Sequence, residues 1–389
     1  MQNRKLTNRI RGALTWSALI ILMVFYAGTW TFPGFYHVTE IYNTLIVFIA
    51  LALLFFGNIS LREKLRQRDV PLILMGAVLI LALVNLFIIH SNKGCFLILA
   101  DFLLVFYLGK ELVLSERMLK ILEIFFLVMY ASWFIYDRAF FYNANTGATV
   151  TVLTLFGAWF LLEKISKKYT LGGFLVVLVL VRTVTLVLWH LARGAFLMLF
   201  VFLVLFFLLP ERVWRNRKFF YGISLFACFG SLLFVVSYIA LAKTGVNPRL
   251  PFFYKNVFSG REMIWQEVWD LFKTMPFTGI GSGRALKSFF EYNIHNAMYD
   301  ILAVHGIPVF ALSVSLILMR LFSAGRKLEE YGADAGRRCA AAAIFALFIE
   351  SFIDMDLMWA DYSPVLLLLL LELFRRGGGA PGKAGKGHG

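Results

Sequence analysis

The segment KTGVNPRLPFFYKNVFSGREMIWQEVWDLFKTMPFTGIGSGRALKSFFEYNIHN, from Lys243 to Asn296, is the only long polar interval in a strongly apolar chain. It contains seven Lys or Arg residues and four Asp or Glu residues, a GIGSG turn, and a final His-Asn pair directly before the next apolar run. This polar loop (243–296) divides the chain into a long apolar part before it and a shorter apolar part after it.

Composition places the apolar parts in a membrane. The chain has 389 residues, of which 60% are hydrophobic and 17% aromatic, whereas soluble domains are about half apolar. Apolar runs of about 18 residues or more recur, and a run of that length can cross a bilayer as a helix. We therefore predict an all-α fold, a polytopic membrane helical bundle rather than a set of soluble domains.

The net charge of +15 would suggest nucleic-acid binding in a soluble protein. Here most Lys and Arg residues lie in short segments between apolar runs, where cytoplasmic loops of membrane proteins carry them, so nucleic acid is not an expected partner. Cys95, Cys228 and Cys339 lie in or beside apolar runs and show neither a disulfide framework nor metal-ligand spacing. The N-terminal segment lacks a small-residue cleavage site, which favours an uncleaved first span.

The apolar runs predict about twelve transmembrane helices. Basic loops alternate with loops of little positive excess, so the pattern places both termini in the cytoplasm and the polar loop outside it. The polar loop is itself basic, against this rule, although long loops translocate largely regardless of charge. We expect four regions: transmembrane helices one to nine at 1–242, an extracytoplasmic loop with amphipathic helices at 243–297, transmembrane helices ten to twelve at 298–374, and a disordered glycine-rich tail at 375–389.

Within the polar loop, REMIWQEVWDLFK (Arg261–Lys273) carries apolar residues on one helical face and charged residues on the other. This pattern predicts an amphipathic helix, which either lies on the bilayer surface or caps the bundle. Pro276 ends the helix. The following GIGSG (279–283) permits close backbone approach, either for a turn or for a phosphate held by free N–H groups.

Two arginines lie at positions that are unusual for a charged residue in a membrane protein. Arg193, in HLARGA at the expected outer surface, either snorkels to lipid headgroups or has a function, since the outer side is the less expected one for arginine. Arg182 lies roughly 12 Å deep in one expected span, and Asp101 lies roughly 9 Å deep in another. Because charges at such depths usually have a partner or face a cavity, the matched depths predict an Arg182–Asp101 pair, with a structural role favoured over a catalytic one.

His295 stands at the outer edge of the apolar run that follows the polar loop. A single histidine is more often structural than catalytic, but histidine beside a basic loop is also the usual general base near neutral pH. The other histidines show no zinc-ligand spacing. Four carboxylates around the last expected outer turn are either partners of loop arginines or members of a solvated turn: Glu350, Asp354, Asp356 and Asp361.

Five motifs occur in order: YNANTGA (142–148), RGA (193–195), SGREMIW (259–265), PFTGIGSG (276–283) and HN (295–296). Their order and their places between apolar runs resemble the O-antigen ligase and polymerase family of bacterial envelope glycosyltransferases, over about Tyr142–Pro308. The resemblance implies that a glycan carried on undecaprenyl diphosphate is joined to an acceptor at the periplasmic face of the inner membrane. The acceptor is a lipid A–core sugar in ligases and another undecaprenyl-linked repeat in polymerases.

The resemblance also implies roles for individual residues. Arg193 and Arg261 would hold the diphosphate and His295 would activate the acceptor hydroxyl, with inversion at the anomeric carbon. The other candidate substrate-binding residues are Arg182, Asn145, Gly281, Arg284 and Asn296. No cofactor is expected, and no carboxylate pair for a divalent metal stands in an outer loop, so the arginines would act without a metal. The sequence departs from the family at His305, where an acidic residue often precedes the glycine, here Gly306.

Several functions remain open. The single dominant outer loop and the compact length favour a ligase, with lipid A–core and the lipid-linked glycan as partners, over a polymerase. A transporter of the same lipid-linked sugar would be expected to show paired repeats with broken helices; no repeat is evident, and Arg182 is the one feature that favours transport. A scaffold that binds acidic membrane lipids would explain the basic loop but not His295.

Overall fold

The computed structural model describes residues 2–32, 34–35, 42–89, 93–135, 144–250, 255–258, 260–282, 294–354 and 357–375. Their regular structure is helical, apart from two antiparallel two-residue strands, β1 (Arg249–Leu250) and β2 (Lys255–Asn256), in which Arg249 faces Asn256. The prediction of a helical bundle is therefore confirmed. The expected glycine-rich tail lies outside the described residues from position 376 onward.

Most helices coincide with the apolar runs of the sequence. Those before the polar loop are α1 (Gln2–Thr31), α3 (Asn43–Asn58), α4 (Leu61–Arg66), α5 (Val70–Ile89), α6 (Lys93–Glu111), α7 (Glu116–Ile135), α8 (Ala144–Lys168), α9 (Gly172–Trp189), α10 (Arg193–Leu203), the π-helical turn η2 (Val204–Leu208), α11 (Glu211–Trp214) and α12 (Arg217–Ala242). The polar loop contains α13 (Arg261–Phe272). After it come α14 (Ala297–Tyr331), α15 (Ala335–Glu350), the 3-10 helix η3 (Ala360–Tyr362) and α16 (Ser363–Phe374).

Seven of the described helices are long and apolar enough to cross a membrane: α1 from Arg9, α5, α7, α8, α9, α12 and α14. The apolar helices Asn43–Asn58 and Arg193–Leu208 are shorter, and α15 and α16 have 16 and 12 residues. The chain is thus a multi-pass membrane protein. The expected number of about twelve spans and the side on which each loop lies stay predictions.

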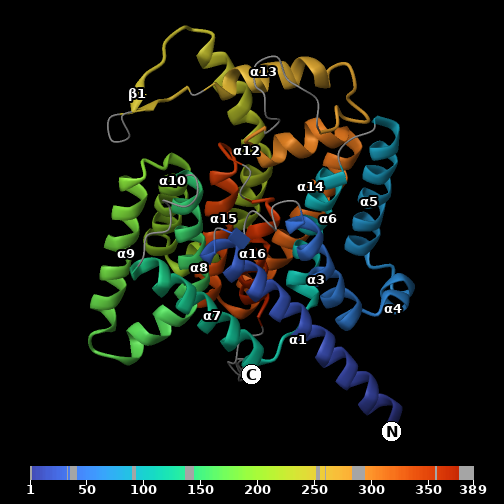
Figure 1. Ribbon diagram of the computed structural model, residues 1–389, viewed down its shortest axis with the longest axis vertical. Coiled ribbons are helices and arrows are strands. Elements are labelled where there is room, and N and C mark those ends of the chain that lie inside the picture. The colour runs from blue at the N-terminus through green and yellow to red at the C-terminus, as the bar shows by residue number, and fades with distance from the viewer. Residues whose placement is uncertain are drawn as a thin grey trace, which may run out of the picture.

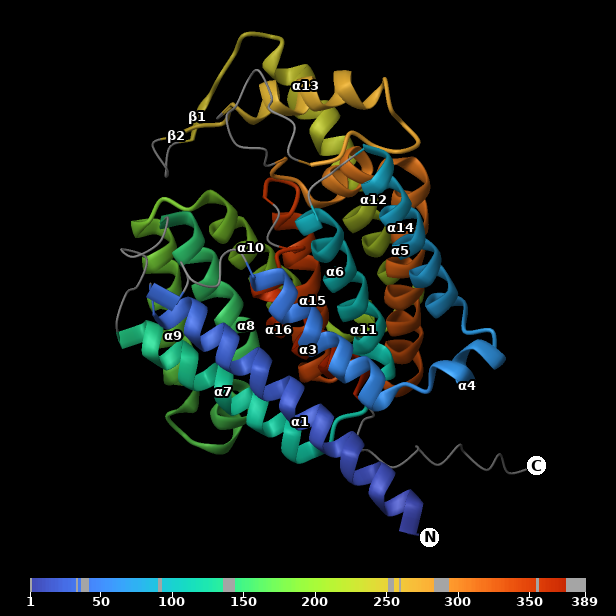
Figure 2. The ribbon, with the colours of Figure 1, turned by 45° about the vertical axis from the view of Figure 1, so that its right-hand side comes forward.

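The last two helices form the centre of the bundle. Every residue of α16 is buried, and α15 and α16 lie between α8 and α10 on one side and α6 on the other (Figures 1 and 2). The described parts of the polar loop, with β1, β2 and α13, lie over the end of the bundle opposite the start of α1 (Figures 1 and 2). Residues that precede, form and follow the polar loop therefore meet at this end.

Helix α13 has the expected amphipathic pattern and caps the bundle. Its indole at Trp265 packs on the ring of Tyr238, with centroids 5.0 Å apart, and Trp265 Nε1 donates a hydrogen bond to the Ile294 carbonyl at 2.5 Å. Trp269, which the pattern places on the apolar face, is 43% exposed. Leu271 is partly buried, and three further apolar residues of the face are buried: Ile264, Val268 and Phe272.

Helix α14 is broken at Gly306, whose φ is 85°. The break frees consecutive carbonyl groups from the helical pattern, and they accept hydrogen bonds from outside the helix. Ala303 accepts from the Ile280 N–H at 2.8 Å, Val304 accepts from the Gly281 N–H at 3.1 Å, and His305 accepts from Asn85 Nδ2 at 3.0 Å. Irregular backbone at membrane depth is tolerated where its polar groups are satisfied in this way.

The GIGSG turn is therefore docked on the break in α14. Gly279 has a φ of 75°, and a Cβ there would lie 2.2 Å from the Val304 oxygen, while a Cβ on Gly306 would lie 2.2 Å from the Phe277 oxygen. Close backbone approach is confirmed, and of its two alternatives, a turn or a phosphate site, the described residues 279–282 form a turn packed on α14. The N–H groups of Ile280 and Gly281 donate to α14 carbonyls, so they are not aimed at a phosphate.

Replacing Gly306 with alanine is expected to destabilise the protein by about 1–3 kcal/mol from backbone strain alone, with steric overlap adding to this. Gly76 on α5 provides a matched control, since nothing lies within 4 Å of its Cβ position and alanine favours a helix. The measurement is thermal unfolding of both purified variants in one detergent. Equal midpoints for Gly306→Ala and Gly76→Ala would contradict the close approach.

The predicted Arg182–Asp101 pair is wrong. Arg182 Nε donates to the Phe134 carbonyl on α7 at 3.4 Å. Asp101 is fully buried, and its carboxylate oxygens have no hydrogen-bond partner among the described residues. Helix α9 packs against α7 and α8, whereas α6 packs against α3, α5 and α16, so equal depth in the sequence does not make these helices neighbours.

Candidate active site

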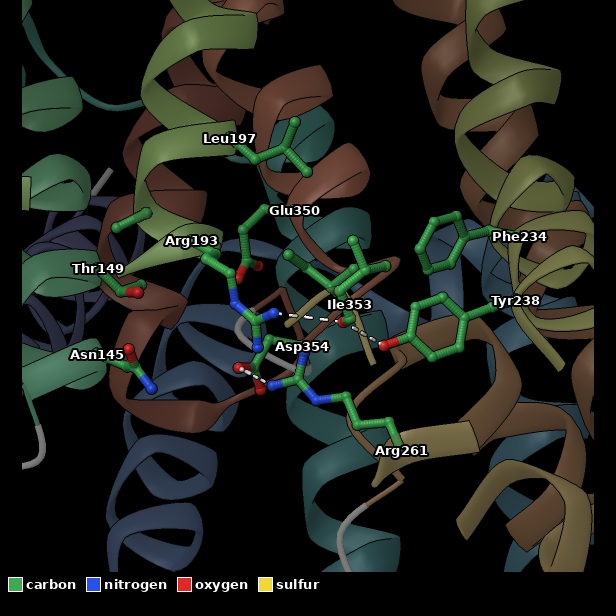
Figure 3. A pocket seen from close by; sticks show the side chains of 13 residues that line it. Asn145, Thr149, Arg193, Leu197, Phe234, Tyr238, Arg261, Glu350, Ile353 and Asp354 are labelled. Carbon is green, nitrogen blue, oxygen red and sulfur yellow. Dashed lines mark hydrogen bonds and ion pairs between the residues drawn. The ribbon is translucent and has the colours of Figure 1, made fainter. Parts of the chain in front are cut away.

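A cavity of about 280 Å³ lies at the end of the bundle beneath the polar loop. Its walls come from α8, α10, α12, the start of α13 and the turn after α15, so five separate stretches of the chain meet there (Figure 3). We call it the arginine cavity because the side chains of Arg193 and Arg261 both point into it (Figure 3). The other side chains that matter below are those of Asn145, Tyr238, Glu350 and Asp354.

Arg193, the first residue of α10, is held against the polar loop. Its Nη1 donates to the Asn256 carbonyl at 2.5 Å and to the Val257 carbonyl at 3.3 Å. The Tyr238 hydroxyl donates to the same Val257 carbonyl at 2.7 Å. A guanidinium group carries five N–H donors, so these two bonds fix its direction and leave donors for a ligand in the cavity.

Gly194 explains why the RGA motif needs its small residue. A Cβ at position 194 would lie 2.8 Å from Glu350 Oε1, and Glu350 is fully buried at the end of α15. The glycine therefore lets the start of α10 approach α15 closely. This approach places the Glu350 carboxylate at the wall of the cavity, beside Arg193 (Figure 3).

Asp354 joins the start of α13 to the end of the polar loop. Its Oδ2 lies 3.4 Å from Arg261 Nη2, at the start of α13, and its Oδ1 lies 3.2 Å from His295 Nδ1, at the end of the loop. All three side chains are between 20% and 28% exposed, so a ligand can reach them. Of the two alternatives for the outer carboxylates, partnership with a loop arginine is confirmed for Asp354. Asp361 instead accepts from Asn43 Nδ2 at 3.3 Å, and Asp356 lies outside the described residues.

His295 is held in a left-handed backbone conformation, with a φ of 50°. Non-glycine residues adopt this conformation rarely, and such strain often occurs at functional sites. Both neighbours are fixed: the Ile294 carbonyl accepts from Trp265, and Asn296 caps α14 by accepting from the Tyr299 N–H at 2.9 Å. The turn is therefore shaped to present the imidazole toward Asp354.

The structure brings together some of the predicted site residues but not others. Arg193, Arg261 and Asn145 line the arginine cavity, and His295 reaches it through Asp354. Asn296 is fully buried and accepts from Ser231 Oγ at 2.7 Å while donating to the Phe352 carbonyl at 2.9 Å, so it positions the turn. The remaining candidates do not line the cavity or lie outside the described residues: Arg182, Gly281 and Arg284.

Comparison with known protein families identifies the segment that carries this geometry. Residues 178–314 match the family model described as O-Antigen ligase. The chain carries an O-antigen ligase domain. This domain is shared by O-antigen ligases and O-antigen polymerases, so the resemblance inferred from the motifs is confirmed. Searches of curated proteins and of solved structures gave no match.

The O-antigen ligase domain runs from within α9 to the first half of α14 and contains Arg193, Arg261 and His295. Asn145 on α8 and Asp354 after α15 lie outside it, so helices on both sides of the domain complete the cavity. The domain belongs to a membrane glycosyltransferase family whose substrates are lipid-linked glycans.

Sequence reasoning missed two residues that shape the cavity of the O-antigen ligase domain. Tyr238 on α12 resembles an ordinary interfacial tyrosine in the sequence, yet it fixes the carbonyl that holds Arg193. Thr149 lines the cavity one helical turn after Asn145. The spacing of Phe234 and Tyr238, four residues apart on α12, is the one signal that could have placed both on a single face.

Proposed function

We propose that this protein is an O-antigen ligase that transfers a glycan from undecaprenyl diphosphate to a sugar hydroxyl of lipid A–core. In this proposal the polar loop lies in the periplasm, and the chain resides in the bacterial inner membrane with both termini in the cytoplasm. The proposal depends on one observation: two guanidinium groups line the same cavity as Asp354, which contacts His295. These groups match the two needs of the reaction, a cationic site for a departing diphosphate and a base for an incoming hydroxyl.

The arginines act on the donor. Transfer breaks the bond between the anomeric carbon and the diphosphate oxygen, and negative charge develops on that oxygen. Guanidinium groups bind phosphate oxygens with two parallel hydrogen bonds and stay charged at any relevant pH. Because Arg193 is already held by backbone carbonyls, its charge needs little reorganisation as the transition state forms.

His295 acts on the acceptor. In this mechanism Nδ1 donates to the Asp354 carboxylate, which leaves Nε2 as the unprotonated ring atom that takes the proton. The acceptor oxygen forms its bond to the anomeric carbon while its proton moves to Nε2 and undecaprenyl diphosphate departs. A single displacement of this kind inverts the configuration at the anomeric carbon. Asp354 stabilises the imidazolium that results.

The broken helix α14 is relevant to the alternative of a transporter. In transporters, carbonyl groups freed by a helix break coordinate substrate or ions. Here the carbonyls of residues 303, 304 and 305 accept hydrogen bonds from the GIGSG turn and from Asn85. The break thus serves to dock the polar loop, which favours an enzyme with its site at one end of the bundle.

Reconstitution tests the proposal and separates ligase from polymerase. Purified protein in vesicles is supplied with an undecaprenyl-diphosphate-linked glycan and lipid A–core, and we expect the labelled glycan to appear on lipid A–core, with equal yield in EDTA. If the label appears instead on the carrier lipid with a lengthened glycan, the protein is a polymerase rather than a ligase. Absence of transfer to either acceptor would contradict both, and loss of activity in EDTA that added metal restores would contradict the arginine mechanism.

A further inference from the structure

A second hollow, of about 570 Å³, lies between α12, α13 and α14. Its lower part is apolar, with Val235 and Ile239 from α12 and Leu302 from α14. Its upper part carries Lys243, Trp269 and Lys273. We call this hollow the lysine groove.

The lysine groove is separate from the arginine cavity. Phe234 and Tyr238 on α12 line the cavity, whereas Val235, Ile239 and Lys243 on the adjacent face of the same helix line the groove. The first residue of α13, Arg261, likewise faces the cavity, while residues of its later turns face the groove. Helices α12 and α13 thus form a wall between two sites that share no lining residue.

The apolar part of the groove opens toward the bilayer. Both α12 and α14 are long and apolar enough to cross a membrane. Beside the groove, the α12 side chains of Leu233 and Val236 are 67% and 65% exposed. A hydrocarbon chain can therefore enter between the two helices from the membrane side.

The polar end of the groove is lined by two lysines. Its charged lining residues are Lys243 and Lys273. The pKa of Asp270 is lowered by the hydrogen bond from Lys273, by the hydrogen bond from Gln266, and to a smaller extent by the charge of Lys243. The carboxylates of Glu262, Glu267 and Asp270 line the adjacent hollow, which shares Lys243 with the groove. The Lys273–Asp270 pair, at 2.7 Å, is more than half exposed on both sides and is weak in water, so Lys273 can contact a ligand.

We propose that the lysine groove binds one anionic phospholipid of the surrounding bilayer, phosphatidylglycerol, with an acyl chain between α12 and α14 and its phosphate at Lys243 and Lys273. Basic pockets between membrane helices are suited to anionic headgroups, and tryptophan is suited to the headgroup level. The positive charge of a phosphatidylcholine headgroup would instead face two lysines. This inference does not rest on the proposed glycan transfer.

The bound lipid would hold the helix that carries Arg261. Trp269 and Lys273 lie at the end of α13 over the groove, and Arg261 lies at its other end in the arginine cavity. An acyl chain beneath the later turns of α13 would therefore fix the position of the helix from the membrane side. Phosphatidylglycerol would thus be a structural component of the cap that the polar loop forms.

Native mass spectrometry of the full chain in detergent tests this proposal. Phosphatidylglycerol and phosphatidylcholine with identical chains are titrated separately, and thermal midpoints are measured in parallel. We expect wild type to retain one phosphatidylglycerol and to gain thermal stability from it, with little effect of phosphatidylcholine. In Lys243→Glu/Lys273→Glu, affinity should fall at least about tenfold. Ala240→Trp fills the groove from an exposed position on α12 without a change in charge. This variant should lose both the retained phosphatidylglycerol and the gain in thermal stability.

Lys167→Glu/Lys168→Glu makes the same charge change on exposed residues at the far end of α8 and should bind phosphatidylglycerol like wild type. Equal retention of phosphatidylglycerol by wild type and by both groove variants would overturn the proposal. So would equal binding of the two phospholipids, or a glycan-bearing lipid as the bound species. His295→Asn should retain the lipid even if it has lost transfer, so failure here is distinguishable from failure of the proposed reaction.

Discussion

Replacement of His295 with asparagine is expected to lower glycan transfer by about 10²–10⁴-fold, the usual contribution of a positioned general base. Asparagine is among the residues that tolerate a left-handed backbone, which position 295 requires at a φ of 50°. The variant therefore keeps the turn and removes the group that accepts the proton. The measurement is the rate of transfer to lipid A–core in vesicles, normalised to the amount of folded protein.

Two further variants test whether the loss of transfer is specific to His295 and its contact with Asp354. Asp354→Asn keeps the size of the side chain that contacts His295 and Arg261 but removes its charge, so transfer should fall while the protein still folds. His190→Asn changes a histidine that does not line the arginine cavity and should retain nearly all activity. Transfer by His295→Asn at the wild-type rate would remove this residue from the mechanism.

Arg193→Lys and Arg261→Lys are each expected to lower transfer by about 10²–10³-fold, as is typical when one group that stabilises transition-state charge is removed. Lysine keeps the positive charge but lacks the planar fork that binds two phosphate oxygens at once. In Arg193→Lys the bonds to the Asn256 and Val257 carbonyls are also altered, so its effect should be the larger of the two. The rate should fall at saturating donor, because the loss concerns the transition state.

Arg182→Lys is the matched comparison for these two variants. Arg182 contacts the Phe134 carbonyl and does not line the arginine cavity, so transfer should stay close to the wild-type rate. A large loss in Arg182→Lys with little loss in Arg193→Lys and Arg261→Lys would place the diphosphate elsewhere and contradict the proposed site.

Local patterns predicted most of the fold. Most of the described helices coincide with apolar runs, because an apolar run of sufficient length has few alternatives in a membrane. The amphipathic helix at 261–272 also followed from its periodicity. The break in α14 did not, since it depends on the contact between Gly279 and Gly306, which are far apart in the sequence. The same contact explains why Gly281 donates to a carbonyl rather than to a ligand.

The candidate site was predictable to the extent that its residues belong to motifs. Arg193, Arg261 and His295 were expected, and the cavity unites the first two while Asp354 connects the third. The sequence left open what Asp354 does, because nothing local distinguishes it from a solvated acidic residue. The Arg182–Asp101 pair was wrong for a related reason: depth along a helix is readable from the sequence, but the identity of the neighbouring helix is not.

The position of Asp354 also determines when the site can form during synthesis. The ribosome makes Arg193, Arg261 and His295 first, but the carboxylate that connects the last two follows α15, which lies in the middle of the bundle. A nascent chain that has completed the polar loop therefore has both arginines and the histidine but lacks the carboxylate that contacts Arg261 and His295. Activity should arise only after α15 has entered the membrane, so an incompletely inserted chain would not act on its substrates.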